Sequence, residues 1–346
     1  MAAGRHMSLS SKGGCALVAC VVLSASVSVS AETQLERVRK RGALTCGVAP
    51  GVAGFALEDG PGRYTGLDID VCRALAAAIF GSADKVRFVP APSVSDFLRS
   101  KDIDVVSRRL TWSLEREGLG LLFGPVTFYD GQGFMVPRER RITSPSGLAA
   151  ARICIVPGAI TEFNLNTYFQ SRNIAFTKVL LRTLDGVDAE FAEGRCDALT
   201  GDVSELGSVL SLMRDGNRFE ILAERISKEP LAQVVRQGDD QFFNILRWTV
   251  FAMIAAEESG VTSANVAAMA AGSANLDVKR MLGVIPGNGR ALGLDEKWAY
   301  NIIRTVGNYG EMFERHVGMN SPIRFKRGLN ALWTDGGLMY APQLRR

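Results

Sequence analysis

Histidine is nearly absent from this chain of 346 residues, which contains only two. One of them, His6, lies close to the N-terminus, and the other, His316, stands far from every cysteine. A zinc site needs closely spaced Cys or His ligands, and a hydrolytic triad needs a histidine beside its nucleophile. The sequence therefore argues against both kinds of site, we expect no metal or cofactor, and we expect His316 to be an ordinary surface residue.

An excess of charge of one sign is also missing. The 40 Lys and Arg residues against 36 Asp and Glu residues give a formal charge of +4, without a dense basic run. That bias is too weak to indicate nucleic acid, so we expect a small molecule as the ligand and a monomeric protein. No low-complexity tract or repeat of solenoid period occurs. The length exceeds what one core usually serves, which predicts two packed units.

The first 31 residues read as a signal peptide. Arg5 and Lys12 precede an apolar stretch over 13–29, and Val29-Ser30-Ala31 has the small-x-small pattern of a cleavage site. This predicts export to the periplasm. The stretch ending at Cys20 also looks like a lipoprotein box, which leaves lipid anchoring as an alternative. A retained membrane anchor is disfavoured, because serines interrupt a stretch that needs about 20 apolar residues to span a bilayer.

Export changes the interpretation of the cysteines, because disulfides form in oxidising compartments. Four cysteines remain after the signal, and three pairings are possible for them: Cys46, Cys72, Cys154 and Cys196. Cys46 ends a predicted strand and Cys72 lies early in the next helix, and the second two stand in similar positions further along. We therefore expect the local pairing of Cys46 with Cys72 and of Cys154 with Cys196.

The mature chain alternates between apolar patterns of strand and helix period, which predicts two α/β lobes. The predicted strands are 43–48, 86–89, 103–107, 126–129, 152–156 and 198–200. The predicted helices are 34–41, 68–80, 161–170 and 240–258, with further helices around 266 and 278 and over 298–316.

Polar side chains follow several of these strands, and ligands in open α/β sheets collect beyond the carboxyl ends of strands. Thr111, Ser113 and Arg116 follow the strand 103–107. A guanidinium held near small hydroxyls can grip a carboxylate with two parallel hydrogen bonds. Arg116 is therefore our candidate for binding the acid end of a ligand.

Two further groups complete a site for a zwitterion. The segment 157–162 follows a strand and opens a helix, so its free amides from Gly158 to Thr161 can accept a carboxylate with help from the helix dipole. Asp202 follows the strand 198–200, where a carboxylate can take an ammonium. We expect these charges to face each other across a cleft.

Several long blocks carry a resemblance that covers essentially the whole mature chain. Among them are LERVRKRGALTCGV, YTGLDIDVCRALAAAIFG, FGPVTFYDGQGFMV, GRCDALTGD, ISKEPLAQVVRQGDDQFF, VGNYGEMFER and SPIRFKRGLNALWTDGGLMYAP. They resemble the periplasmic general amino-acid-binding proteins of ABC transporters. The resemblance implies capture of L-amino acids in a cleft between two lobes and delivery to a membrane permease.

The same resemblance implies a type II periplasmic binding fold, an α/β architecture with two hinge strands and here a C-terminal helical extension. The hinges would lie near 129–131 and 227–232. Lobe one would hold residues 32–130 and 232–346, and lobe two residues 131–231. By the same correspondence Arg116 would bind the ligand carboxylate and Asp202 its ammonium, and the loop amides of Gly158, Ala159, Ile160 and Thr161 would complete the carboxylate site.

The chain departs from the family pattern at positions that matter for specificity. Relatives usually show Asn-Thr-Thr where this chain has Arg109-Leu110-Thr111, and Gly-Thr-Thr-Thr-Glu where it has Gly158-Ala159-Ile160-Thr161-Glu162. Each lost side-chain hydrogen bond costs about 0.5–1.5 kcal/mol of binding. Arg109 would favour glutamate or aspartate if it met an acidic ligand side chain; the alternative is a surface arginine facing solvent.

Two other functions fit the same resemblance, because fold does not fix function. One is a dehydratase acting on amino-acid-like cyclic acids, for which a carboxylic acid such as Glu162 or Glu229 would have to supply the general acid. The other is a ligand-binding sensor module that signals to a receptor. The lack of an activated nucleophile favours a binding protein over an enzyme.

Overall fold

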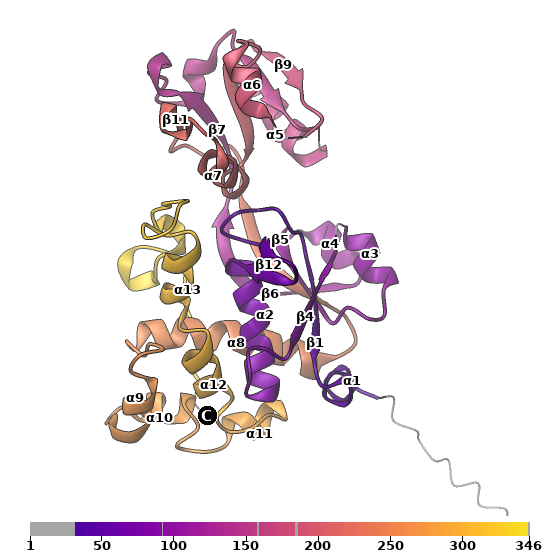
Figure 1. The fold of residues 1–346 in the computed structure, drawn as a ribbon, viewed down its shortest axis with the longest axis vertical. Helices are drawn as coiled ribbons and strands as arrows, with labels where there is room; N and C mark the ends of the chain where they lie inside the picture. The colour runs from indigo at the N-terminus through magenta and orange to yellow at the C-terminus, as the bar shows by residue number, and fades with distance from the viewer. Residues whose placement is uncertain (1–31, 92, 158, 184–185, 345–346) are drawn as a thin grey trace, which may run out of the picture. The chain divides into compact units, whose positions relative to one another are not determined.

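Two five-stranded sheets form the framework of the protein (Figure 1). The first has the order β4-β1-β5-β12-β6 and the second the order β11-β7-β10-β8-β9. The strands of the first sheet are β1 (Leu44–Val48), β4 (Val86–Pro90), β5 (Val105–Thr111), β6 (Leu121–Asp130) and β12 (Glu229–Arg236). Those of the second are β7 (Gln132–Pro137), β8 (Arg152–Ile155), β9 (Thr177–Leu180), β10 (Ala198–Asp202) and β11 (Phe219–Ile221).

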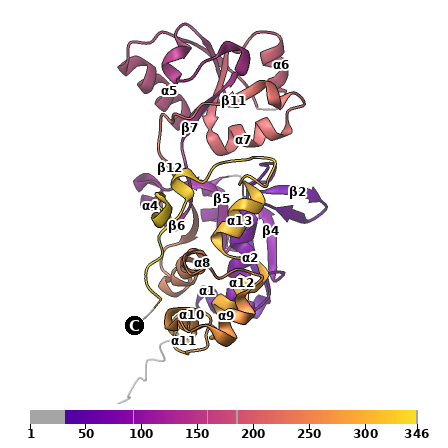
Figure 2. The same cartoon turned by 90° about the vertical axis from the view of Figure 1, so that its left-hand side faces the viewer.

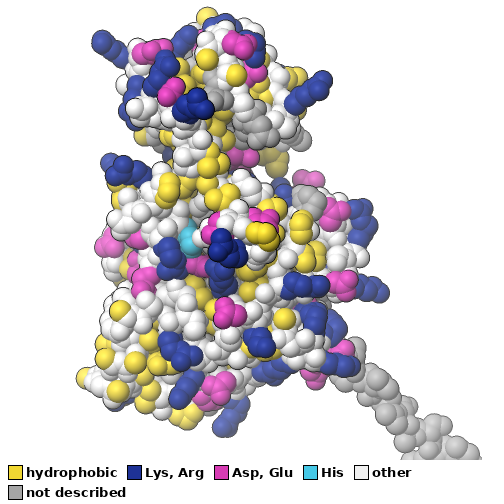
Figure 3. Space-filling model, viewed as in Figure 1, with side chains coloured by type: hydrophobic (Ala, Val, Ile, Leu, Met, Phe, Trp, Pro, Cys, Tyr) yellow, Lys and Arg dark blue, Asp and Glu magenta, His cyan; other side chains and the backbone are white. Residues whose placement is uncertain are grey.

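The computed structural model describes residues 32–344 except 92, 158, 184 and 185. The predicted signal peptide, Cys20 and the predicted site residue Gly158 lie outside the described residues. No helix in the described part is both long enough and apolar enough to cross a bilayer. Charged side chains of both signs are mixed over the face seen in Figure 3, in keeping with the small net charge.

Four strands of the first sheet overlap predicted strands, whereas β12 was not predicted and β5 and β6 are longer than predicted. β1 is buried along its whole length and pairs in parallel with β4 and β5. Two helices pack together beside this sheet, α2 (Leu67–Phe80) and α8 (Asp240–Glu258). Their apolar faces join the strands in one core, because a helix with a wide apolar stripe is stable only when that stripe is covered.

The predicted helices over 34–41 and 240–258 are confirmed at both ends, because their caps are strong. In α1 (Gln34–Arg41), Thr33 and Glu36 form a reciprocal capping box, and Gly42 ends the helix in the left-handed conformation. The predicted range 298–316 is divided into α12 (Trp298–Thr305) and α13 (Tyr309–His316). Gly307 adopts a φ of 99°, and Asn308 then caps the second helix.

The remaining elements are short, and several were not predicted. The helices are α3 (Val94–Arg99), α4 (Leu114–Gly118), α5 (Ala159–Ser171), α6 (Val187–Ala192), α7 (Val203–Leu212), α9 (Val266–Gly272), α10 (Leu276–Met281) and α11 (Asn288–Leu292). A separate hairpin joins β2 (Leu57–Gly60) and β3 (Arg63–Thr65). The second sheet has its own cores on its two faces.

Two chain segments pass between the sheets. β6 ends the first sheet at Asp130, Gly131 follows, and β7 begins the second sheet at Gln132. The chain returns through β12, whose first residue, Glu229, pairs with Asp130. A Cβ on Gly131 would come within 2.6 Å of the Ser227 carbonyl oxygen, so the close approach of the two segments requires glycine there. The predicted hinge ranges and lobe boundaries remain predictions.

The expected disulfides are both confirmed. Cys46 bonds Cys72 with their Cα atoms 6.3 Å apart, and Cys154 bonds Cys196 with Cα atoms 5.5 Å apart. Each bond ties a buried strand to a later part of the chain, Cys72 in α2 and Cys196 in the loop before β10.

The expectation that His316 is a surface residue is wrong. Only 8% of it is exposed, because it lies on the apolar side of α13 that packs against α2. Its Nε2 lies 2.6 Å from Oδ2 of Asp70, and Arg315 donates to the same oxygen. His316 therefore belongs to a buried polar network and takes no part in the site described below.

Removing a disulfide should destabilise the fold without altering it. The bonds span 26 and 42 residues along the chain, and bridges over such loops stabilise proteins by about 2–4 kcal/mol. We expect the double variants Cys46→Ser/Cys72→Ser and Cys154→Ser/Cys196→Ser to lose about that much in urea unfolding. Reductant should destabilise the parent protein by breaking both bonds. Each double variant keeps one disulfide, so reductant should destabilise it only by breaking that remaining bond.

Candidate functional site

Arg116 is an arginine without an ionic partner in the described part of the chain. It lies in the short helix α4, whose start Ser113 caps by accepting from the Arg116 amide at 3.4 Å. Its Nη1 donates to the Thr111 carbonyl oxygen at 2.6 Å, which anchors the half-buried guanidinium at the end of β5. Burial lowers the pKa of Arg116, while the charges of Glu229, Glu115 and Asp202 act in the opposite direction. The remaining donors of the guanidinium are free for a ligand.

Asp202 is the opposite charge, and it too has no hydrogen bond or ion pair within the described residues. It ends β10 and precedes α7, at the position of a helix cap, yet its side chain caps nothing. Burial, reinforced by the negative charges of Asp130 and Glu229, raises the pKa of the Asp202 carboxyl to about 7. Its charge acts on Arg116. The two predicted ligand-binding charges therefore lie within electrostatic reach of each other, one from each sheet.

Arg109 is not a surface residue facing solvent. It is half-buried with a φ of 54°, and its Nη1 donates to the Ser204 hydroxyl at 3.1 Å. The guanidinium lies 5.7 Å from the centre of the Phe55 ring. Burial raises the pKa of three nearby carboxyls, those of Asp68, Asp130 and Asp202, and the positive charge of Arg109 opposes that rise. Arg109 therefore lies among carboxyl groups of the protein.

Asp130 performs the capping that Asp202 does not. Both of its carboxylate oxygens accept from the Ser204 amide in the first turn of α7, the closer at 3.1 Å. Burial raises the pKa of Asp130, and these hydrogen bonds oppose that effect. Because Asp130 ends β6, the segment between the sheets holds the start of α7 directly.

The predicted carboxylate loop meets the start of α5. Ala159 is the first residue of that helix, Ile160 is 47% exposed, and Glu162 forms an ion pair with Lys178 at 2.6 Å. The Thr161 carbonyl oxygen accepts from Nε2 of Gln132 at 3.1 Å. Such a helix start presents unpaired amides, which attract anions.

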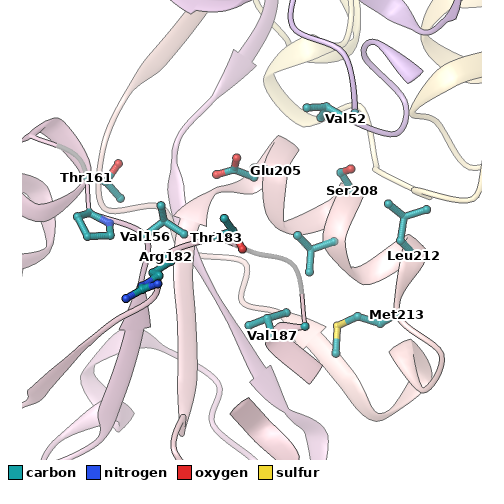
Figure 4. A pocket seen from close by; sticks show the side chains of 14 residues that line it. Val52, Val156, Thr161, Arg182, Thr183, Val187, Glu205, Ser208, Leu212 and Met213 are labelled. Atoms are coloured by element: carbon teal, nitrogen blue, oxygen red, sulfur yellow. The ribbon is translucent and has the colours of Figure 1, made fainter. Parts of the chain in front are cut away.

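A cavity of 730 Å³ lies beyond the ends of strands β8, β9 and β10 (Figure 4). Thr161 and Glu205 line it, and so do Arg182 and Thr183 beyond β9. Val52 reaches it from the other sheet's side. Arg109, Thr111, Arg116 and Asp202 do not line this cavity. The roles of Arg116 and Asp202 in ligand binding therefore stay predictions from the sequence.

The sequence reasoning missed two buried polar residues that hold the site together. Gln132, fully buried, donates to both Thr161 and the Thr200 hydroxyl, and it pairs with Asp202 across the strands β7 and β10. Asp68 at the start of α2 accepts from the Ser107 hydroxyl at 3.0 Å, and burial raises its pKa to about 6. An aspartate inside an otherwise apolar helix start is a signal for Asp68; no local signal marks Gln132.

Two open α/β sheets joined by two crossing segments, with a cavity beyond the ends of the strands, are the architecture of a binding protein for a small solute. The chain belongs to the bacterial extracellular solute-binding proteins, family 3, whose sequence profile matches residues 44–263. The resemblance noted in the sequence is confirmed.

Relatives of known description align over almost the whole chain. The general L-amino acid-binding periplasmic protein AapJ of Rhizobium johnstonii is 45% identical over 335 residues, which is 95% of this chain and 98% of the relative. The glutamate/glutamine/aspartate/asparagine-binding protein BztA of Rhodobacter capsulatus is 43% identical over 96% of this chain and 98% of its own length.

A solved structure extends the comparison to the fold. A periplasmic binding protein of an ABC transporter from Brucella ovis, with glutathione bound, is 42% identical and superposes with a TM-score of 0.84 over 90% of this chain and 99% of its own. An ancestral cationic amino acid solute-binding protein, 23% identical with a TM-score of 0.55, covers 66% of this chain and 97% of its own and shares the fold alone.

The raised pKa of Asp202 predicts a specific effect on stability. Between about pH 4 and pH 7 the folded protein holds a proton on Asp202 that the unfolded chain releases, so this group makes stability fall as the pH rises. We expect Asp202→Asn, which cannot ionise, to be more stable than the parent at pH 8 by about 2–4 kcal/mol. The difference should vanish near pH 4, as measured by urea unfolding across pH.

Asp197→Asn is a control of opposite sign. The hydrogen bond from Arg152 lowers the pKa of Asp197, so its ionised form stabilises the fold above the unfolded pKa. That variant should be less stable than the parent at neutral pH, and the loss should shrink in acid. A gain in stability for Asp197→Asn, or none for Asp202→Asn at pH 8, would contradict this electrostatic description.

Proposed function

We propose that this protein captures L-amino acids in the periplasm and delivers them to the membrane permease of an ABC transporter. The observation that carries the proposal is the pair of half-buried, opposite and unpaired charges, Arg116 and Asp202, within electrostatic reach of each other. Both are costly without a partner. A molecule with a carboxylate at one end and an ammonium at the other relieves both costs at once.

The two ends of the ligand are bound differently. Arg116 can offer a carboxylate two parallel hydrogen bonds, since Thr111 occupies only one of its donors. The amides at the start of α5, at Ala159, Ile160 and Thr161, add donors from the second sheet's side. The ammonium meets Asp202 and restores its charge, so binding below about pH 7 releases a proton from that carboxyl.

The ligand range follows from what the site keeps and what it lacks. Ala159 and Ile160 supply amides but no hydroxyl, which weakens the grip on the carboxylate by about 0.5–1.5 kcal/mol for each missing bond. Arg109 lies near three protein carboxyls and donates to Ser204 of α7, so we infer that it supports α7 rather than meeting an acidic ligand side chain. The cavity of 730 Å³ leaves room for long side chains. A broad range that extends to small peptides fits the relatives that bind several amino acids or hold glutathione.

Delivery depends on closure of the two lobes. A ligand that bridges Arg116 and Asp202 makes more contacts when the lobes are closed, and that difference in affinity shifts the population toward the closed form. The permease then recognises the closed shape of a monomer. We propose no enzymatic step, because the chemistry of the site is that of capture: one cation, one carboxylate and a set of amides.

Loss of either charge should weaken binding strongly and spare the fold. Truncating one partner of a buried charged pair costs about 2–5 kcal/mol, so Arg116→Gln and Asp202→Asn should weaken amino-acid binding by about 30-fold or more. Isothermal titration after a thermal-shift screen of the common amino acids measures this. Arg99→Gln makes the same change at an exposed arginine of α3 and should bind as the parent does.

A stable Arg116→Gln variant with full affinity would refute the assignment of Arg116. If no amino acid binds to the parent protein, incubation with prephenate or arogenate tests the dehydratase alternative directly, through the appearance of an aromatic product.

A further inference from the structure

The segment Ser321–Asn330, here called the C-terminal strap, lies outside the residues that the family profile matches, which end at 263. It follows α13 and runs beneath α7, as the yellow ribbon shows in both views (Figures 1 and 2). Arg327 fixes it to α8 through a bidentate ion pair with Glu257, with N–O distances of 3.0 and 3.2 Å. The strap is thus held to α8 beside the first sheet, and its other side faces α7.

The end of the strap grips the segment between the sheets. Asn330, buried to all but 5%, accepts from the Tyr129 amide at 2.6 Å and donates to the Tyr129 carbonyl oxygen at 3.2 Å. β6 is an edge strand, and Pro230 on its other side pairs with Tyr129 in the register. The side-chain amide of Asn330 therefore bonds the free edge of β6 as a neighbouring strand would. It does so one residue before β6 ends and the chain passes to the second sheet.

The contact between Asn330 and Tyr129 lies one residue before Asp130, whose carboxylate caps α7. Asp130 follows Tyr129 and caps α7 through the Ser204 amide at 3.1 Å. Ser204 lies two residues beyond Asp202. A continuous path of contacts therefore runs from Asn330 through the backbone of 129–130 to the start of α7.

The middle of the strap touches α7 by a second route. Gly207 has no side chain, and a Cβ there would fall 2.3 Å from the ring of Phe325 and 3.2 Å from Ile323. The ring of Phe325 also packs against Phe128 of β6, with centroids 6.2 Å apart. α7 presents its smallest residues on this side: Ser204 binds Arg109, and Ser208 accepts from the Ala53 amide at 2.8 Å. The helix rests on the strap and on the first sheet's loops through one face.

We propose that the C-terminal strap positions Asp202 for the ammonium of the ligand, by holding the start of α7 through Asn330 and its body through Phe325. We treat Phe325 and Asn330 as positioning residues, since neither lines the cavity. This inference rests on the proposed function, because it concerns the affinity for the ligand. It predicts that the contact of the strap with α7 determines where Asp202 stands relative to Arg116.

Phe325→Ala tests the proposal with two measurements. Binding of L-glutamine and L-glutamate by calorimetry should weaken by about 3-fold to 30-fold, the range for residues that couple to a site from a distance. The second measurement needs no ligand: NMR titration of the Asp202 carboxyl, on which Asp130, Glu229, Arg109 and Glu205 also act. Loosening α7 admits water, so the titration midpoint should fall from about 7 toward the ordinary value of an aspartate.

Two variants and one control complete the experiment. Phe325→Leu keeps an apolar contact and should recover most of both properties. Leu329→Ala removes a strap side chain that is 54% exposed and should change neither. If Phe325→Ala does not fold, Gly207→Ala perturbs the same contact from the helix side and should show the same two changes.

The outcomes separate this inference from the proposed function. Failure of the parent protein to bind any amino acid sinks the proposed function, and the Asp202 titration then still tests the positioning role. A Phe325→Ala or Gly207→Ala variant that melts lower but keeps the parent's affinity and Asp202 midpoint shows that the strap is merely structural and overturns the inference.

Discussion

An uncompensated carboxylate at the end of β10 is the constraint on which the rest of this structure depends. Asp202 is half-buried near Asp130 and Glu229, and no side chain of the described chain pairs with it. An arrangement of this kind costs stability, and proteins retain such costs where function needs them. Much of the surrounding structure can be understood as the means of keeping that carboxylate in place and unsatisfied.

The division of work between two aspartates makes this possible. A carboxylate at the start of a helix normally caps it, and Asp202 stands at that position in α7. Asp130 comes from β6 and takes the capping role through the Ser204 amide, so the helix start is satisfied without using Asp202. Arg109 tempers the charge of both without closing an ion pair with either. The helix is stable, and the carboxylate beside it remains available.

One face of α7 carries small residues where it meets elements of the first sheet's side. Ser204, Gly207 and Ser208 are spaced as one side of a helix and are buried. Small residues allow close contact, and two of them make polar bonds to the first sheet's elements, Arg109 and Ala53. Polar and small contacts separate more easily than an interdigitated apolar core, which suits a protein whose lobes are proposed to move.

Local chemistry made much of this predictable from the sequence. Capping residues and apolar stripes determined the ends of α1 and α8, and the places of the cysteines relative to the predicted strands and helices gave the disulfide pairs. The ends of strands indicated Arg116 and Asp202 as candidates for ligand binding, which remains a prediction. His316, Gln132 and the Asn330–Tyr129 contact were decided only by tertiary structure. Asn330 and Tyr129 are 201 residues apart along the chain, and no pattern of period two or 3.6 records such a meeting. Helices, strands and their ends depend mainly on residues that are close in the sequence. The partners of a buried polar group depend instead on how the helices and strands pack together.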